Sequence, residues 1–597
     1  MESVADRSEI DEEYTWDLES IFATEEEWEQ AFENVHEDIE VMRGYEGRTT
    51  ADAETVLATL EHRDELMRTV NTVAAYARHR SDEDTRDQEA QAMRTRAESL
   101  RSEAVSAASF VEPELGTLTA EEFESMVEAV PALETYDHYV DDVLRQKPHT
   151  RSAEVEAVLA DIGEVLAAPG RMFSMLSDAD MTFPSVETPD GESVEITQSN
   201  VTTLLKRPDR DFRQRVYEAY FGEWETVRNT VATAYEHSVK ADVKLARIRN
   251  YDSAREAALD RPNVPVDVYD VLIETVEDNL DLLARYCECK RDRLDVENLQ
   301  MWDLYAPVVE SDSPTITYEQ AREYIVESVE PLGRPYQSLL EEGFDARWID
   351  VYENDGKYSG AYSGGTYDTH PFILMNYQED ITSMYTLAHE LGHSLHSEFT
   401  KDAQPYVYSG YEMFVAEVAS TVNEALLTKH LLETVDDDQI REHVYNEFLE
   451  RVRSTLYRQT MFAEFERRTH ELVERGEALT ADRLDECFRQ LKSRYYEPVV
   501  IDDHIGREWM RIPHFYRAFY VFQYATGISA ALAITDRVLT EDGDAAADYL
   551  AFLRRGSRGY PLELLEIAGV DMRRSDPIDR ALETFEEVLD EFEAQTS

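Results

Sequence analysis

Apolar residues recur at three- and four-residue intervals over long parts of this chain. Residues 53–110 and 272–298 are two such stretches, with charged residues at most of the positions between. This periodicity is typical of amphipathic α-helices. Only 22 glycines and 19 prolines interrupt the 597 residues, and the sequence shows neither a repeat of fixed period nor a low-complexity linker. The pattern therefore predicts a mainly α protein.

Two short islands break this helical pattern. Residues 181–198, MTFPSVETPDGESVEITQ, alternate on both sides of a Pro-Asp-Gly turn, which is typical of a β-hairpin. Residues 347–377 combine an alternating segment, several glycines and a short apolar run. We expect this second island to form one small β-sheet that leads directly into the helix after it.

These changes of pattern divide the chain into three predicted parts. Residues 1–115 form an N-terminal helical region, and residues 116–198 form a helical segment that ends in the β-hairpin. Residues 199–597 hold the second island and the motifs described below, so we expect them to form the catalytic domain.

The chain carries a strong negative charge that is spread along its whole length. Its 126 acidic and 58 basic residues give a net charge of −68, while 42% of the residues are hydrophobic and can build a core. Such a surface repels nucleic acids and anionic membranes, which argues against both as partners. It also suits a halophilic protein, because high salt screens the self-repulsion. An ordinary acidic protein is the alternative.

The cysteines and apolar segments indicate a cytoplasmic protein. Cys287, Cys289 and Cys487 are odd in number and lack the spacing of a disulfide framework or a structural zinc site. The N-terminal segment is acidic and has no apolar leader. No apolar run approaches the length of about 18 residues that a membrane span needs. We therefore expect reduced thiols and no membrane segment.

The segment YTLAHELGHSLHSEF, residues 385–399, carries the first candidate chemistry. His389 and His393 are four residues apart, so on a helix they lie on one face and can bind one metal ion. Zinc suits two neutral imidazoles. Glu390 can lean toward the same point and take a proton from a water molecule there, as the HExxH pattern does in zinc proteases. The alternative is a polar helix face that binds no metal.

A catalytic zinc site needs a third protein ligand. The continuation HExxHxxGxxH is excluded, because His396 and Phe399 occupy the positions of its glycine and last histidine. Glu398 follows His393 by five residues, so it has rotated away from the ligand face. The third ligand should therefore come from another helix.

Residues 413–431, MFVAEVASTVNEALLTKHL, supply such a helix. The connector before it contains Pro405 and Gly410, so this helix can fold back against the first one. Glu417 and Glu424 are seven residues apart and share one face. We predict that Glu417 is the third ligand and that Glu424 orients a ligand histidine. The alternative is that both are solvated glutamates.

Two more segments offer candidates for substrate binding and catalysis. Residues 359–366 are glycine-rich but lack a phosphate-loop motif, so we interpret them as an edge strand that a peptide can extend. Gly364 and Gly365 are the substrate-binding candidates there. The aromatic segment HFYRAFYVFQYATG, residues 514–527, offers hydrogen-bond donors for the oxyanion of a peptide intermediate. These donors are His514, Tyr516, Tyr520 and Tyr524.

As a set, the motifs resemble oligoendopeptidase F, a family within the thimet-oligopeptidase-like zinc peptidases. The resemblance rests on HELGH, FVAEVAST, GKYSGAYSGG and HFYRAFYVFQYATG, together with WDL near Trp16 and WDLYAP at residues 302–307. It covers nearly the whole chain. It implies a two-lobed helical body with a deep central cleft.

The resemblance also implies roles for individual residues. In that family the two motif histidines and the glutamate of the FVxE segment bind zinc, and these are His389, His393 and Glu417 here. Glu390 matches the general base, and the resemblance supports Glu424 as the acid behind a ligand. No departure from the family pattern occurs at these positions.

For the oxyanion, relatives use a histidine and a tyrosine from the aromatic segment. Carried over to this chain, they are His514 and Tyr524. The segment differs by one residue in spacing from the more distant thimet branch, so the choice among the tyrosines stays open. Tyr516 and Tyr520 remain candidates for substrate binding.

The sequence thus predicts a zinc-dependent endopeptidase that cleaves internal bonds of short, unstructured peptides with one Zn²⁺ per chain. A related helical zinc carboxypeptidase is the first alternative, with Arg507, Arg511 or Arg517 binding the terminal carboxylate. A non-catalytic peptide-binding protein is the second. The oligomeric state, the cleavage-site preference and the physiological substrate stay open.

Overall fold

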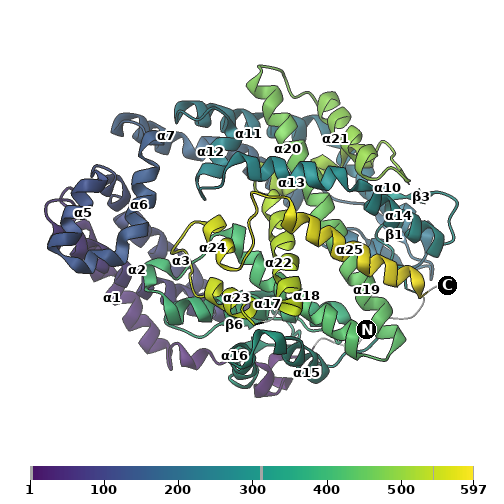
Figure 1. Ribbon diagram of the computed structural model, residues 1–597, viewed down its shortest axis with the longest axis horizontal. Coiled ribbons are helices and arrows are strands. Elements are labelled where there is room, and N and C mark those ends of the chain that lie inside the picture. The colour runs from purple at the N-terminus through teal and green to yellow at the C-terminus, as the bar shows by residue number, and fades with distance from the viewer. Residues whose placement is uncertain (1–4, 310–313, 542, 596–597) are drawn as a thin grey trace. The chain divides into compact units, whose positions relative to one another are not determined.

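Helices account for most of the chain in the computed structural model, which describes residues 5–309, 314–541 and 543–595 (Figure 1). The chain packs into two compact units. The first comprises Met1–Lys147, Ser313–Asp436 and Ile534–Val570, and the second Pro148–Asp312, Asp437–Ala533 and Asp571–Ser597. The predicted mainly α fold with two lobes is confirmed. The three consecutive domains predicted from the sequence divide the chain differently and stay a prediction, as does the central cleft.

Three long helices open the first unit: α1 (Glu25–Arg43), α2 (Ala53–Glu83) and α3 (Gln88–Ala108). Each begins after a residue whose side chain accepts a backbone N–H of the first turn, namely Thr24, Asp52 and Asp87. The helices pack on one another around a shared apolar core. Shorter helices follow: α4 (Val111–Leu115), α5 (Ala120–Ala129) and α6 (Asp137–Arg145).

The first unit contains a three-stranded sheet, which confirms the sheet predicted for residues 347–377. Its strands are β4 (Ile349–Asp350), β5 (Tyr362–Gly364) and β6 (Phe372–Leu374), in the order β4-β6-β5. The central strand, β6, pairs parallel to β4 and antiparallel to β5, and its three side chains are fully buried. In this order β5 is an edge strand.

The chain runs from β6 into α17 (Ile381–Ala403), which packs against β5 and β6. The next long helix, α18 (Met413–Thr434), folds back along α17. Further helices complete the first unit: α15 (Tyr318–Ser328), α16 (Arg334–Asp345), α23 (Ala545–Leu553) and α24 (Pro561–Ile567).

The second unit contains the predicted hairpin and most of the remaining helices. The hairpin is confirmed: β1 (Ser185–Glu187) pairs antiparallel with β2 (Ser193–Glu195), and Gly191 takes a positive φ of 82° in the turn. A short parallel pair joins β3 (Leu299–Gln300) to β7 (Val499–Val500).

In the second unit, α20 (Arg458–Glu474) packs against α11 (Arg228–Ile248), α13 (Val266–Asp278) and α21 (Ala481–Tyr495). The others are α7 (Ala153–Leu166), α8 (Ala168–Met175), α9 (Val201–Leu205), α10 (Arg210–Thr226), α12 (Ala254–Asp260), α14 (Leu280–Arg293), α19 (Asp438–Val452) and α25 (Asp576–Ala594). One helix, α22 (Phe522–Thr540), begins in this unit and ends in the first.

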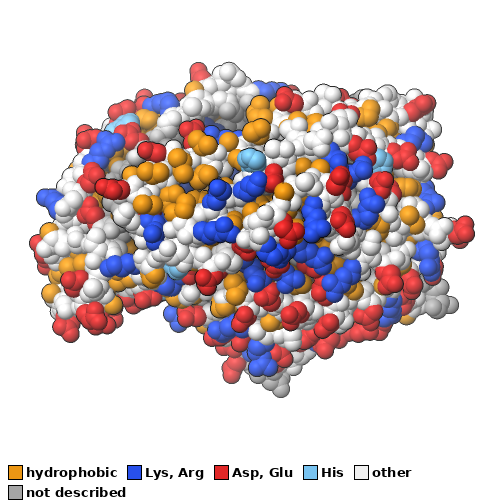
Figure 2. Space-filling model, turned by 90° about the horizontal axis from the view of Figure 1, so that it is seen from above, with side chains coloured by type: hydrophobic (Ala, Val, Ile, Leu, Met, Phe, Trp, Pro, Cys, Tyr) orange, Lys and Arg blue, Asp and Glu red, His pale blue; other side chains and the backbone are white. Residues whose placement is uncertain are grey.

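Surface and thiols agree with the composition. Acidic side chains are scattered over the face shown in Figure 2, with basic and hydrophobic side chains among them. Cys287 and Cys487 are buried and Cys289 is half-buried, and all three are reduced. Among the described residues, no helix is both long enough and apolar enough to cross a membrane.

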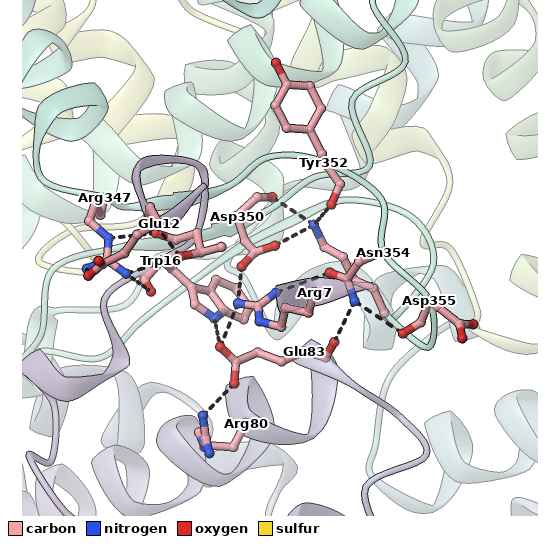
Figure 3. A network of polar contacts seen from close by, with 12 residues as sticks. Arg7, Glu12, Trp16, Arg80, Glu83, Arg347, Asp350, Tyr352, Asn354 and Asp355 are labelled. Carbon is pink, nitrogen blue, oxygen red and sulfur yellow. Dashed lines mark hydrogen bonds and ion pairs between the residues drawn. The ribbon is translucent and has the colours of Figure 1, made fainter. Parts of the chain in front are cut away.

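A buried ionic network ties the N-terminal segment to α2 and to β4 (Figure 3). One terminal nitrogen of Arg7 donates to Glu83 at 2.7 Å and to Asp350 at 2.6 Å, and the indole of Trp16 donates to Glu83 at 3.0 Å. The other oxygen of Asp350 pairs with Lys357 at 2.6 Å, where the two side chains are 2% and 0% exposed. The WDL segment near Trp16 therefore helps to fix the first strand of the sheet.

Replacing Asp350 by asparagine should destabilise the first unit strongly. The ammonium of Lys357 would stay buried without a counter-charge, and breaking such a pair costs about 3–5 kcal/mol. Thermal and denaturant unfolding of the full chain, at fixed salt, measures the change. The control is Glu29→Gln, because Glu29 and Arg96 form an exposed pair worth less than about 1 kcal/mol. Equal effects of the two substitutions would contradict the expected role of the network.

Candidate metal centre

The helix α17 presents the HExxH residues from the first unit. It begins after Asp380, whose side chain accepts the backbone N–H of Ser383 at 2.7 Å. Leu387, Leu391 and Leu395 are fully buried on its inner side. This burial fixes the rotation of the helix about its axis, which points His389 and His393 to the opposite, more open side.

A glycine allows the second ligand helix to come close. A Cβ at Gly392 would lie 2.6 Å from the Cα of Ser420 and 2.7 Å from the carbonyl oxygen of Ala419, both in α18. These distances are far below van der Waals contact, so only glycine fits between the two backbones. The contact places Glu417, one turn before Ser420, opposite the two histidines. The local sequence of HELGH does not by itself reveal this role of Gly392.

The structure brings the three predicted ligands together. The Nε2 atoms of His389 and His393 are 3.1 Å apart, and Glu417 Oε2 lies 3.6 Å and 4.0 Å from them. Two atoms bound to one tetrahedral zinc ion at about 2.0–2.1 Å are roughly 3.3 Å apart. Among the described residues, this is the one group of three such side chains close enough to share a metal ion. Two imidazoles and one carboxylate fit zinc in both chemistry and spacing.

Protonation and orientation of the histidines also suit a metal. Burial, with smaller contributions from His389 and His396, lowers the pKa of His393 to about 3, so its imidazole is neutral. His389 Nδ1 lies 2.9 Å from Glu424 Oε1, and Glu424 is only 6% exposed. A proton on Nδ1 shared with this carboxylate directs the lone pair of Nε2 toward the point that His389 shares with His393 and Glu417.

Glu390 and the edge strand lie beside the ligands. Glu390 is 8% exposed, and burial raises the pKa of its carboxyl group, while His389 and a hydrogen bond to the backbone of Ser363 oppose that rise. The hydroxyl groups of Ser363 and Ser394 are 2.9 Å apart, so β5 is fixed directly onto α17. A group that keeps a proton more readily than usual suits a proton carrier.

A cavity of about 1320 Å³ in the first unit is lined by residues of α17, α18 and β5. His393 and Glu417 line it together with Gly364 and Gly365, the two glycines predicted to bind substrate. A Cβ at Gly364 would lie 3.2 Å from the ring of His79, and Gly365 takes a positive φ of 137°. The edge of β5 is thus kept free of side chains where the cavity passes it.

His396 and Glu398 stay apart from the ligands, as expected. The ring of His396 is buried and stacks on Tyr411 with the ring centres 3.8 Å apart. Glu398 pairs with Lys401 on its own helix.

The predicted oxyanion donors belong to the second unit. The ring of His514 stacks parallel to that of Tyr520 at 5.9 Å, and the hydroxyl group of Tyr524 donates to that of Tyr520 at 3.4 Å. Tyr516 is placed differently, because its ring stacks on Phe173 and its buried hydroxyl has no hydrogen-bond partner among the described residues. Three of the four candidates therefore form one group.

A buried glutamate that the sequence reading missed shapes this group. Phe519 has a positive φ of 54°, an unfavourable conformation for a bulky residue. Its backbone N–H donates to Oε1 of the fully buried Glu466 at 3.0 Å, which holds the turn just before Tyr520. Burial raises the pKa of Glu466 well above its ordinary value. The signal in the sequence was an acidic residue within the apolar face of α20.

Two histidines and a glutamate that converge beside a buried glutamate define a metallopeptidase of the HExxH class on a mainly α fold. The profile described as Peptidase family M3 matches residues 203–584, and that described as Oligopeptidase F matches residues 114–183. The chain therefore belongs to Peptidase family M3.

Individual relatives agree with this assignment over nearly the full length. The chain is 41% identical over 589 residues to Oligopeptidase PepF of Bacillus subtilis, covering 98% of this chain and 88% of that protein. The crystal structure of oligoendopeptidase-F from Enterococcus faecium has a TM-score of 0.75 and 34% identity, covering 96% and 99% of the two chains. A solved structure from Chlamydophila abortus reaches a TM-score of 0.90 at 32% identity, covering 99% and 100%. The chain is thus an enzyme of the metalloendopeptidase class.

Replacing Gly392 by alanine should disturb the metal site without touching a ligand. The added methyl group would push α18 away from α17 and move Glu417 off the histidines. We expect metal affinity to fall about 10–100-fold, as when groups that orient ligands are disturbed. Competition with a chelator of known affinity measures this. The control is Gly222→Ala in α10, where a Cβ meets nothing within 4 Å. Wild-type affinity in the Gly392 variant would contradict this account of the helix contact.

Proposed function

We propose that this chain is a zinc-dependent endopeptidase that hydrolyses internal bonds of short, unstructured peptides with Glu390 as general base. The observation that carries the proposal is the convergence of His389, His393 and Glu417 beside a cavity that His393, Glu417 and the edge of β5 line. When bound, zinc supplies a Lewis acid that polarises the scissile carbonyl group and makes water more acidic.

Residues of the chain itself bind the peptide and transfer the proton. An extended peptide adds to the edge of β5 by main-chain hydrogen bonds, which positions it without demanding a particular sequence. Glu390 takes a proton from the attacking water as the oxygen bonds to the carbonyl carbon. The C–N bond then breaks, and Glu390 passes that proton to the departing amine.

The second unit supplies the hydrogen-bond donors that we propose for the oxyanion. We assign stabilisation of the developing oxyanion to His514 and Tyr524, with Tyr520 holding both of them in place. The rings of His514 and Tyr524 meet edge to face with centres 5.9 Å apart, so the two can act as a pair. Tyr516, whose ring stacks on Phe173, contributes to the packing of this unit.

The carboxypeptidase alternative has less support in the second unit. Arg507 pairs with Asp485 and Glu225, and Arg511 pairs with the buried Glu508. Two of the three arginines proposed to bind a terminal carboxylate are therefore engaged elsewhere. An edge strand also suits a peptide that continues past the cleavage point. Product analysis separates the alternatives, because an endopeptidase releases internal fragments and a carboxypeptidase releases single residues.

The single experiment that tests the function compares wild type with Glu390→Gln on an internally quenched short peptide. We expect kcat to fall by at least about 100-fold while both proteins retain one zinc per chain, because the amide cannot accept the proton. The control is Glu433→Gln, an exposed glutamate near the end of α18. Equal rates for wild type and the Glu390 variant, or no metal in either protein, would reject the proposal.

We also propose that the enzyme works in the cytoplasm at high salt. The net charge of −68 supports the high-salt part of this proposal, because such self-repulsion is strong at low ionic strength and screened at high ionic strength. The same cleavage assay, repeated over a range of KCl concentrations, decides it. A rate that is highest at low salt would speak against a halophilic enzyme.

A separate substitution tests whether Glu424 orients the ligand His389. Glu424→Gln keeps the shape of the side chain but removes the charge that the Nδ1–H of His389 faces at 2.9 Å. We expect about 10–100-fold weaker zinc binding, measured by chelator competition. Unchanged affinity would show that Glu424 does not orient the ligand.

A further inference from the structure

The cavity beside the ligands has the opposite charge balance from the rest of the chain. Acidic residues outnumber basic ones by 126 to 58 overall. In the cavity wall six basic side chains face three acidic ones: Arg63, Arg68, Arg78, Arg94, Arg101 and Lys401 against Asp64, Glu98 and Glu417. One of those three acids is a predicted metal ligand. A wall of this sign, in a chain of this composition, indicates an anionic ligand.

Most of these basic groups already have partners. Arg63 pairs with Asp64, Arg68 with Asp368, and Lys401 with Glu398. Arg94 pairs with both Asp82 and Glu98, and Arg78 reaches Asp82 at 3.5 Å. Among the described residues that line the cavity, Arg101 is the basic one with no ion pair.

Arg101 is nevertheless held in place. Its Nε donates to Asn71 Oδ1 at 3.1 Å, and the amide nitrogen of Asn71 donates to the hydroxyl group of Tyr406 at 3.0 Å. All three residues line the cavity. This chain of hydrogen bonds uses Nε and leaves the two terminal nitrogens of the guanidinium group available. That pair of nitrogens matches the two oxygens of a carboxylate.

The position of Arg101 relates it to the edge strand. Arg78 lies over the ring of Tyr362 in β5 at 4.2 Å, and Arg94 shares Asp82 with it. Arg101 follows Arg94 by two turns of α3, which is about 10 Å along the helix. That distance is roughly the reach of three residues of extended peptide. A peptide that lies on β5 can therefore place a charged group at Arg101 a few residues away.

We propose that Arg101 binds a carboxylate of the peptide substrate while the scissile bond lies at the metal ligands. The inference rests on the proposed peptidase function and adds a specificity determinant to it. The carboxylate comes either from the C-terminus of the peptide or from an acidic side chain, since both present the same two oxygens. If it is the C-terminus, Arg101 also helps to set the length of peptide that is cleaved.

The test uses the full-length enzyme and quenched peptides that share one internal sequence. One pair of peptides differs only in a free or amidated C-terminus, and a second pair differs only in glutamate or glutamine near one end. Each peptide is cleaved by wild type, Arg101→Gln and Arg101→Lys. The matched control is Arg96→Gln on the same helix, because Arg96 pairs with the exposed Glu29 and does not line the cavity.

We expect wild type to prefer the peptide with the carboxylate by about tenfold or more in kcat/KM, mainly through KM, as loss of a charge-assisted pair predicts. Arg101→Gln should abolish this preference, Arg101→Lys should restore part of it, and Arg96→Gln should keep it. A preference within the first pair of peptides identifies the C-terminus as the source, and one within the second identifies a side chain.

Two outcomes overturn the inference, and they are distinct. If all proteins cleave and the preference is the same in wild type and Arg101→Gln, Arg101 does not bind a carboxylate and the peptidase function still stands. If wild type cleaves none of the peptides, the proposed function fails and this inference fails with it.

Discussion

The candidate metal centre depends on one close contact between two backbones. At Gly392 the helices α17 and α18 approach so closely that no side chain fits between them, and this brings Glu417 to the two histidines. The same α17 carries Ser394, which holds β5 through Ser363. Two ligands and the base lie on α17, and contacts of α17 position Glu417 and the edge strand. Their mutual geometry is therefore set before any metal or peptide arrives.

The charge of the chain is distributed unevenly between surface and interior. Of its nine lysines, Lys290, Lys357 and Lys492 have side chains no more than 2% exposed, and each pairs with a carboxylate. Lysine is thus scarce overall but retained at buried positions where a compact cation has a fixed partner. Burial lowers the pKa of Lys492 to about 8 even beside Glu508, which shows how costly these charges are to bury.

Much of the fold and of the ligand set could be predicted from local pattern. Helical periodicity predicted the region of residues 53–110 that forms α2 and α3, the Pro-Asp-Gly turn located the hairpin, and the spacing of His389 and His393 placed them on one face of a helix. Groups whose role arises only from distant packing could not be found this way. Glu466 acts on a backbone N–H more than fifty residues away in sequence. Among the described arginines that line the cavity, Arg101 is distinguished from the others only by having no ion pair. Neither property can be inferred from the residues next to Glu466 or Arg101 in the sequence.

The open edge of β5 has a consequence for self-association. An exposed strand edge presents unpaired backbone N–H and C=O groups, with which a strand of another chain can pair and so start aggregation. Proteins commonly prevent this by keeping edge strands short or by covering them. Here the edge is three residues long, ends in glycine and faces a cavity walled by α2 and α3. A second folded copy would have to bring a strand past those helices to reach it. The protein can therefore keep unpaired backbone groups available to a loose peptide without offering its own copies a site for fibre growth.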